Sequence, residues 1–221
     1  METKTKQLKK DLLTWYTDNK RSFSWRNTND PWKILLIEII SQQTQINRAD
    51  TYYQKFIKRF PTPESMSKSS LKTILKMWSG LGYNNRAKRL YESSKLLAEQ
   101  GFEGIYPNFE ILPGVGPYTK NAILSFAYGD NVLAVDTNLQ RIIIRYFGID
   151  NTKDYLREYS DLLLESIKSE DLNQAFMDFG SSICTSSNTK CDICPLEKNC
   201  KKYFFNSNNS IKKFKGSNRE L

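Results

Sequence analysis

The chain has 221 residues, 39% of them hydrophobic, which is enough to bury a core in one large domain or two small lobes and argues against a disordered tail protein. Its 33 lysines and arginines exceed its 24 aspartates and glutamates, and the net charge of +9 favours a polyanionic partner, with nucleic acid ahead of an anionic membrane surface. Histidine is absent, which excludes His-dependent triads and His-based zinc catalysis.

Helical spacing of apolar residues begins near the N-terminus and continues along the chain without a run of alternating strands. Glycine and proline clusters separate the runs. No run reaches the roughly 18 apolar residues of a membrane span, and the N-terminus lacks the apolar core of a signal peptide, so we expect a cytoplasmic protein. The sequence predicts an all-α fold of about ten helices, with runs over residues 6–20, 32–47, 48–60, 68–78, 84–100, 117–128, 136–147, 153–168 and 171–183.

A single carboxylate, Glu38, interrupts the apolar run in the second predicted helix. Burying an ionised carboxylate is costly, so the sequence predicts a raised pKa and a group able to carry a proton. The structural alternative is a position at the polar edge of the helix.

Two glycines, Gly114 and Gly116, lie between helical segments in the stretch Leu112–Thr119. Glycine there allows a close approach of backbone amides to a phosphate oxygen, although such a turn alone is weak evidence. About twenty residues later, Asp136 precedes an apolar helix, where a helix N-cap is the structural alternative to a chemical role.

The four cysteines, Cys184, Cys191, Cys194 and Cys200, all lie within one short segment near the end of the chain. In a reducing compartment such grouped cysteines bind metal more often than they form disulfides. Four thiolates suit zinc or a [4Fe-4S] cluster, and thiolate chemistry alone does not choose between them.

The cysteine spacing resembles the cluster loop of the endonuclease III superfamily of helix-hairpin-helix glycosylases, which implies a [4Fe-4S] cofactor on these four cysteines. The glycine turn resembles the hairpin with which that superfamily grips the DNA backbone. Asp136 resembles the family's catalytic aspartate, whose charge stabilises an oxocarbenium-like sugar.

Three further stretches, Trp25-Arg26, Ile37–Thr44 and Trp78–Tyr83, resemble the adenine DNA glycosylase (MutY) family, with the likeness covering residues 12–203. The resemblance implies that Glu38 protonates adenine at N7 and that a glutamine wedge fills the emptied base stack. It assigns base recognition or DNA binding to Trp25, Arg26, Gln42, Gln43 (the wedge), Thr44, Tyr83, Gly114, Gly116, Asn138 and Gln174.

Gln174 resembles a glutamine that contacts adenine, because a carboxamide can pair with the donor and acceptor of a purine edge. The alternative is an exposed helix residue.

Tyr118 occupies the position where bifunctional relatives carry a lysine, and tyrosine cannot form a Schiff base, so we expect a monofunctional glycosylase. The same tyrosine occurs in small thymine glycosylases of T/G mismatches, so excision of thymine or uracil opposite guanine is the alternative function. A catalytically silent DNA-binding module is a third. Thr137 and Ser41 depart from the adenine family's usual glycine and leucine, and we expect the chain to lack that family's C-terminal 8-oxoguanine-recognition domain.

The leading prediction is a base excision repair hydrolase, monomeric and nucleoid-associated, that releases adenine mispaired with guanine or 8-oxoguanine in double-stranded DNA. Its catalytic residues are Glu38, Asp136 and Tyr118. The resemblance implies a six-helix barrel lobe over residues 23–131 and a second lobe formed by residues 1–22 and 132–200, the cluster loop spanning 184–200. Residues 201–221 are expected to form a basic tail, mobile from Tyr203 onward.

Overall fold

The computed structural model describes residues 1–202, and these contain helices and turns but no β-strand, which confirms the predicted all-α class. The described chain divides into two compact units, one formed by 20–136 with 164–174, the other by 1–19, 137–163 and 175–202. The α-helices are α1 (Glu2–Asn19), α2 (Pro31–Ser41), α3 (Ile46–Arg59), α4 (Pro63–Ser67), α5 (Leu71–Trp78), α6 (Asn85–Ile105), α7 (Pro117–Ile123), α8 (Thr137–Phe147), α9 (Lys153–Leu164) and α10 (Ser169–Ser182). Shorter turns are η1 (Phe109–Ile111), the π-helix η2 (Leu124–Tyr128), η3 (Cys191–Ile193) and η4 (Glu197–Asn199).

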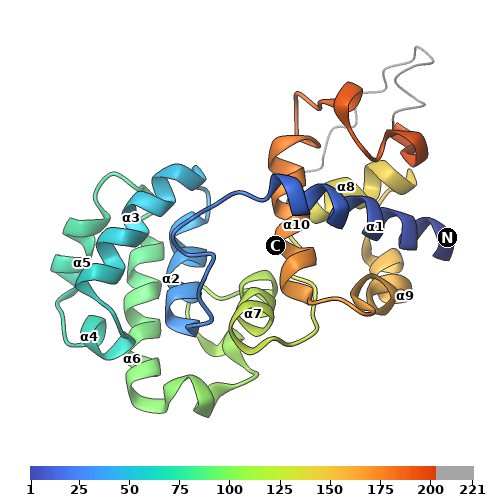
Figure 1. The fold of residues 1–221 in the computed structure, drawn as a ribbon. Helices are drawn as coiled ribbons and strands as arrows, with labels where there is room; N and C mark the ends of the chain where they lie inside the picture. Colours follow the sequence, from blue (N-terminus) through green and yellow to red (C-terminus); the bar gives the residue numbers. More distant parts are fainter. Residues whose placement is uncertain (203–221) are drawn as a thin grey trace. The chain divides into compact units, whose positions relative to one another are not determined.

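Helix α2 forms the centre of the unit that contains residues 20–136, where it packs against α3, α6, α7 and η2 (Figure 1). A helix that is apolar all round has to be buried on every side, and α2 follows this rule from Trp32 to Ile40 with the exception of Lys33. Glu38 is therefore carried into the core by the helix on which it lies.

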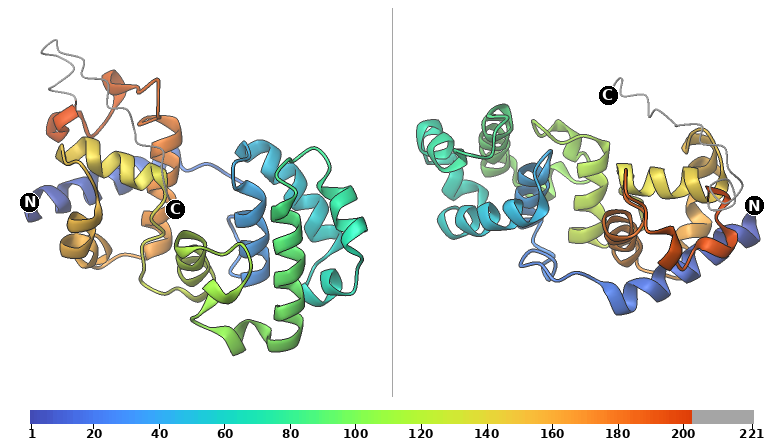
Figure 2. Two further views of the ribbon diagram at one scale, coloured as in Figure 1. Left: turned by 180° about the vertical axis from the view of Figure 1, so that it is seen from behind. Right: turned by 90° about the horizontal axis from the view of Figure 1, so that it is seen from above.

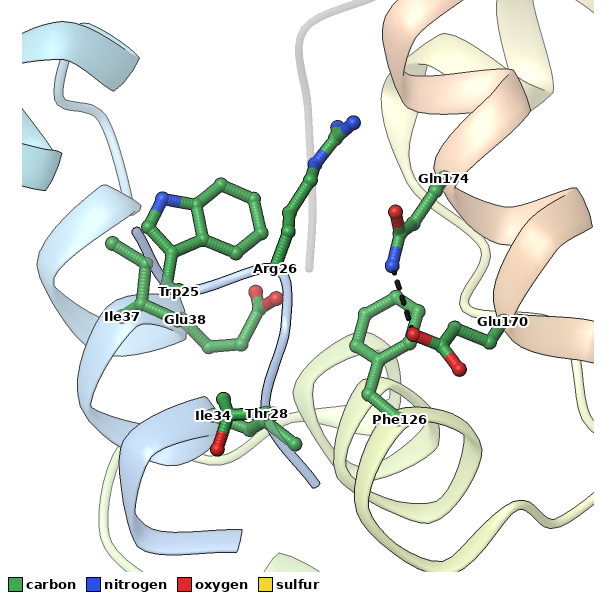
Figure 3. A pocket seen from close by; sticks show the side chains of 9 residues that line it. All are labelled: Trp25, Arg26, Thr28, Ile34, Ile37, Glu38, Phe126, Glu170 and Gln174. Atoms are coloured by element: carbon green, nitrogen blue, oxygen red, sulfur yellow. Dashed lines mark hydrogen bonds between the residues drawn. The ribbon is translucent and has the colours of Figure 1, made fainter. Parts of the chain in front are cut away.

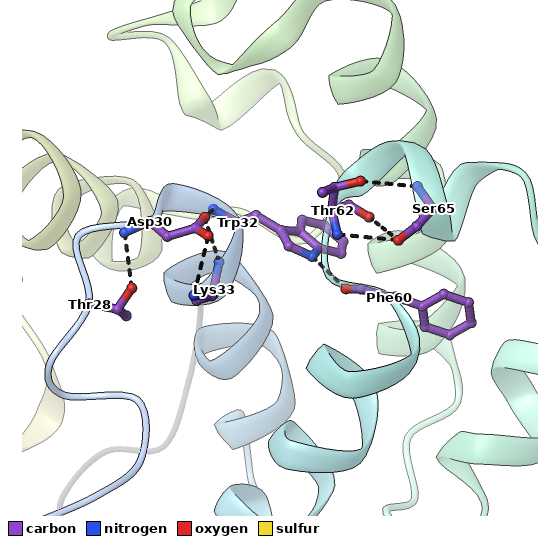
Figure 4. Close-up of polar contacts among 7 residues, drawn as sticks. All are labelled: Thr28, Asp30, Trp32, Lys33, Phe60, Thr62 and Ser65. Atoms are coloured by element: carbon purple, nitrogen blue, oxygen red, sulfur yellow. Dashed lines mark hydrogen bonds and ion pairs between the residues drawn. The ribbon is translucent and has the colours of Figure 1, made fainter.

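Local hydrogen bonds define where α2 begins (Figure 4). The side chain of Asp30 caps the helix by accepting from the amides of Trp32 and Lys33, at 2.9 and 3.3 Å. The indole Nε1 of Trp32 donates to the carbonyl of Phe60 at 2.9 Å, which fixes the helix against the end of α3. A capping box between Thr62 and Ser65 then starts α4.

The helix predicted over 32–47 is wrong beyond Ser41, because α2 ends there and α3 begins at Ile46. Gln43, in the intervening turn, has φ 52°, which a helix cannot contain. The run 117–128 also changes from α-helix to π-helix at Leu124, and the short α4 is not among the predicted helices. The other predicted helices exist with shifted ends.

In the second unit, α1 packs beside α8 and α10, as the views of Figure 2 show. Trp15 meets Phe179 of α10 edge to face at 5.0 Å between ring centroids. Lys4 donates to the carbonyl of Tyr146 in α8 at 2.9 Å. The N-terminal helix is thus tied to chain segments more than a hundred residues away.

Residues 164–174 pack with residues 20–136, and the division between the units falls within α10. The predicted lobes, with boundaries at 22/23 and 131/132, stay a prediction. The expected tail from Tyr203 lies outside the described residues. Within the described part, no helix is long and apolar enough to cross a membrane.

Candidate active site

A pocket beside α2 brings together side chains from four segments of one unit (Figure 3). Its interior space is about 10 Å³, room for about one water molecule, so a base that enters has to part the walls. Trp25 contributes a buried indole Nε1 that has no hydrogen-bond partner among the described residues, and an acceptor on a ligand would satisfy it. The lining residues are Trp25, Arg26, Thr28, Ile34, Ile37, Glu38, Phe126, Glu170 and Gln174.

Glu38 is only 5% exposed within this pocket. Burial raises its pKa to about 7, a hydrogen bond with the Tyr118 side chain acts in the opposite direction, and the negative charge of Asp136 raises it further. The raised pKa predicted from the sequence is therefore present. A carboxyl group with this pKa holds its proton at neutral pH in a substantial fraction of molecules, as a general acid requires.

Tyr118 and Asp136 lie close enough to Glu38 to affect its protonation, so the structure brings the three predicted catalytic residues together. Burial and then the charges of Glu38 and Asp136 hold the pKa of Tyr118 well above its usual range. Tyr118 therefore stays a neutral phenol that donates to the Glu38 carboxylate.

A buried polar network fixes the extended segment that leads into Asp136. The Asn173 side chain, 1% exposed, accepts from the amide of Ala134 and donates to the carbonyl of Val132, both at 3.0 Å. It also donates to Ser125 Oγ at 3.0 Å, which links the segment to η2. The oxygen and the nitrogen of the Asn173 carboxamide thus both form hydrogen bonds with the backbone just before Asp136.

Replacing Asn173 by leucine should lower the free energy of unfolding by about 2–4 kcal/mol, because it leaves the amide of Ala134 and the carbonyl of Val132 without a partner and leaves Ser125 Oγ only its bond with Ser169. Ser169→Ala is the graded comparison: its hydroxyl donates to the carbonyl of Asp130 at 2.7 Å, and we expect a loss of about 1 kcal/mol. Urea denaturation of both variants measures the difference. Equal losses of unfolding free energy would show that the hydrogen bonds of Asn173 stabilise the protein no more than those of Ser169.

The buried Glu38 should also make the protein's stability depend on pH. Its pKa of about 7 in the fold lies above the ordinary value of 4.5, so its stabilising contribution is complete below pH 4.5 and is lost as pH rises through 7. Glu38→Gln carries no such titration. The variant should gain up to about 3 kcal/mol over the wild type between pH 5 and pH 8. Urea unfolding of both proteins at the two pH values tests this, and parallel stabilities would contradict the raised pKa.

Gln174 is buried at 8% exposure and lines the pocket, so the alternative that it is an exposed helix residue is wrong. Its amide Nε2 donates to Glu170 Oε1, one helical turn earlier, at 3.2 Å (Figure 3). Sequence reasoning missed Glu170. The signal available was its spacing of four residues from Gln174, which places both side chains on one helix face.

The predicted DNA-contacting residues Gln42, Gln43 and Tyr83 line a second cavity of about 610 Å³ in the same unit. Gln43 is exposed and Tyr83 is 66% exposed. Gln42 is held by a hydrogen bond from its Nε2 to the carbonyl of Gly114 at 3.3 Å. The turn after α2 and the glycine hairpin are therefore neighbours.

The hairpin glycines differ in what they require. Gly114 has φ 89°, and a Cβ there would lie 3.3 Å from Arg89 and 3.4 Å from Ile39, so both conformation and space favour glycine. Gly116 has φ −97° and open space around it, and it precedes α7 as the N-cap. Only the first of the two positions depends on the absence of a side chain.

Asn138 lies in the other unit, one residue after Thr137 on α8. Its Oδ1 accepts from Arg141 at 2.6 Å, and its side chain packs on Gly180, where an added Cβ would lie only 2.5 Å from it. A local structural role in joining α8 to α10 is thus visible, and its predicted contact with DNA stays a prediction.

The four cysteines are thiols, each partly buried. Burial raises the pKa of Cys194 to about 12, and the three other thiols add to this rise, so each of them lies within electrostatic range of Cys194. Arg145 on α8 donates to Cys184 Sγ at 3.4 Å. No three of the Cys, Asp or Glu side chains in residues 1–202 are grouped closely enough to hold a single metal ion.

Comparison with known families identifies the class. The description "HhH-GPD superfamily base excision DNA repair protein" matches residues 36–166, which include Glu38, Tyr118 and Asp136. The chain belongs to this superfamily, and the resemblance inferred from the hairpin and cysteine spacing is confirmed.

Individual relatives show which members of the superfamily the chain resembles. The chain is 42% identical to an adenine DNA glycosylase of Buchnera aphidicola subsp. Baizongia pistaciae, over 88% of this chain and 58% of that protein. It is 34% identical to the adenine DNA glycosylase of Mycobacterium tuberculosis, over 85% of this chain and 65% of that protein. A solved thermostable thymine-DNA glycosylase is 32% identical with a TM-score of 0.83, covering 92% of this chain and 98% of that one. The chain thus spans about three fifths of the length of these two adenine DNA glycosylases.

Proposed function

We propose that this protein is a monofunctional DNA glycosylase that hydrolyses the N-glycosidic bond of adenine mispaired with guanine or 8-oxoguanine. The observation that carries the proposal is Glu38, a buried carboxyl group with a pKa of about 7 in a pocket that also offers an amide and an indole donor. Adenine leaves poorly as an anion, so its departure needs a proton, and Glu38 can supply one.

Recognition of the base follows from the pair formed by Gln174 and Glu170. Because the Gln174 Nε2 donates to Glu170, one of its donors is used within the pair. Its carbonyl oxygen and the remaining lone pairs of Glu170 are acceptors, which match the exocyclic amino group of adenine. Thymine presents a carbonyl at the corresponding edge and would meet these acceptors unfavourably.

The chemistry then divides among three side chains. Glu38 gives its proton to N7 of the extruded base and, once ionised, orients the attacking water. Asp136 stabilises the positive charge that develops on the sugar, and it does so only as the bond breaks, which is the condition for lowering the barrier. Tyr118 keeps the Glu38 carboxyl in place through its hydrogen bond. Since a phenol cannot form a Schiff base, the product is an abasic site in an uncut strand.

Double-stranded DNA is the proposed partner of a monomer that works in the cytoplasm at the nucleoid. The exposed Gln43 and Tyr83 would enter the duplex where the base has left, and the hairpin at Gly114 and Gly116 would contact the backbone. Arg26, Thr44 and Asn138 complete the proposed contacts.

Excision of thymine or uracil opposite guanine is the second candidate, favoured by the likeness to the thymine-DNA glycosylase, of which this chain covers 98%. Thymine can leave as an anion that its own carbonyls stabilise, so it depends less on a buried acid. Single-turnover base release from duplexes with one A·8-oxoguanine, A·G, T·G or U·G pair decides between the two. Release confined to pyrimidines would overturn the adenine proposal, and release from none would favour a silent DNA-binding module.

We also infer that Cys184, Cys191, Cys194 and Cys200 hold a [4Fe-4S] cluster. The chemistry of the donor set fits: four partly buried cysteines supply the thiolate ligands that such a cluster takes, and Cys194 lies within electrostatic range of the other three. When bound, the cluster would cross-link the loop over residues 184–200.

The purified protein should therefore contain about four iron and four acid-labile sulfide atoms per chain. Cys194→Ser should lose most of both, because it removes one of the four thiolate ligands. Elemental analysis with zinc measured in the same sample is the test. About one zinc per chain without sulfide would contradict the cluster.

A further inference from the structure

We propose that Arg86 is a positioning residue that holds, through one buried side chain, the two segments that carry the exposed Gln43 and Tyr83. We call these the wedge turn (42–45) and the tyrosine loop (79–83). The part of this inference that concerns catalysis rests on the proposed glycosylase function.

Arg86 lies in the first turn of α6 and is only 6% exposed. No carboxylate forms an ion pair with it among the described residues. All of its hydrogen-bond acceptors are carbonyl and hydroxyl oxygens, which is unusual for a buried guanidinium, because buried charges are normally paired. The role of this buried side chain is therefore to supply several hydrogen-bond donors in a fixed planar arrangement. Its positive charge has no counter-ion among the described residues.

One arm of the fork binds the end of α2 and the wedge turn. Its Nη1 donates to the carbonyl of Ile40 at 2.8 Å and Thr44 Oγ1 at 3.1 Å, with a longer bond of 3.3 Å to Ile39 and a close contact with the Gln42 carbonyl. These carbonyls belong to the last turn of a helix, where no intrahelical donor remains for them. Arg86 therefore supplies the C-terminal cap of α2.

The other arm binds the tyrosine loop. Its Nη2 donates to the carbonyls of Leu81 and Gly82, at 3.1 and 3.2 Å. The guanidinium carbon also lies 5.1 Å from the centre of the Trp78 ring and 5.7 Å from that of Tyr83, so two aromatic faces enclose it. The Tyr83 side chain is thereby placed even though two thirds of it faces solvent.

Both segments are strained in the same way. Gln43 has φ 52° and Tyr83 has φ 47°, and only one other non-glycine residue in the described chain, Ser166, has a positive φ. A left-handed conformation at such residues persists only where surrounding contacts enforce it. The two residues that the fold holds in this conformation beside Arg86 are the two expected to enter DNA, so the wedge would be formed before the duplex binds.

Arg86→Lys tests the idea because it keeps the positive charge but replaces the fork by a point donor with three protons, which cannot serve both segments. In the DNA-free protein, amide hydrogen exchange in the wedge turn and the tyrosine loop should accelerate together by about tenfold or more. Arg59→Lys, the same change at an exposed position at the end of α3, should leave both segments as in the wild type. Acceleration in one segment or in neither would overturn the shared anchor.

The same variant tests the consequence for the reaction. Arg86→Lys should slow single-turnover base release by about tenfold or more, while its affinity for an undamaged duplex stays within about threefold of the wild type. A wild-type rate alongside loosened segments would refute the positioning role. A wild-type protein that releases no base would refute the proposed function instead, and the exchange result would still decide whether Arg86 anchors both segments.

If Arg86→Lys does not fold, Thr44→Val removes one acceptor and keeps the side-chain shape. Exchange should then accelerate in the wedge turn only, because Arg86 still donates to Leu81 and Gly82. Acceleration in the tyrosine loop as well, or in neither segment, would contradict the geometry described above.

Discussion

Replacing Glu38 by glutamine should reduce the release of adenine by between about 10² and 10⁴-fold, because the variant keeps the shape of the side chain but has no proton to give. The wild-type rate should in turn fall as pH rises through about 7, since Glu38 has to be protonated at the start of the reaction and its pKa lies there. The variant's residual rate should not show this fall. Single-turnover assays on an A·8-oxoguanine duplex between pH 5 and pH 9 measure both effects.

Duplex binding is the control for this experiment. Glu38 is buried beneath the pocket surface, so Glu38→Gln should bind a duplex that carries an uncleavable adenine analogue about as tightly as the wild type. Glu110→Gln, which removes an exposed carboxylate paired with Lys120 at 3.0 Å, should keep full activity and the full pH dependence. A Glu38→Gln enzyme that retains more than about a tenth of the rate would exclude Glu38 as the general acid.

The sequence was sufficient to find Glu38, and the reason is physical. A single carboxylate in a run of aliphatic residues has to be buried if the helix is buried, and burial alone produces most of the rise in its pKa. Asp136 and Tyr118 were found through the resemblance instead, because no local pattern reveals that residues 38, 118 and 136 meet.

The sequence could not predict where α2 ends. The stretch after Ile40 contains neither glycine nor proline, so the local pattern continues the helix to residue 47. The last turn instead gives the carbonyls of Ile39 and Ile40 to the guanidinium of Arg86, more than forty residues later. The spacing of apolar residues within either segment cannot reveal a contact between segments so far apart in the chain.

Glu170 could not be predicted as a pocket residue for a related reason. It lies at the start of α10 beside Asp171, where acidic residues are common because they complement the helix dipole. Only the packing of α10 against the pocket shows that one of the two acids is partly buried and bonded to Gln174, while its neighbour is exposed. The same packing buries Asn173, whose network had no signal in the sequence.

Replacing Asp136 by asparagine should lower base release by about 10² to 10³-fold, because the developing positive charge on the sugar loses the charge that stabilises it. A second effect separates this role from a loss of folding. The negative charge of Asp136 raises the pKa of Glu38, so its removal should lower that pKa and move the alkaline fall of the residual rate to lower pH.

Asp130→Asn provides the matched control, because Asp130 precedes the same extended segment but its carboxylate accepts from the exposed Tyr106, at 3.0 and 3.2 Å. It should change neither the rate nor the pH profile. A reduced rate in Asp136→Asn with an unmoved profile would mean that Asp136 acts on the sugar alone and that its charge does not reach Glu38 once DNA is bound. A rate within twofold of the wild type would remove Asp136 from the mechanism and leave the proton from Glu38 to carry the whole acceleration.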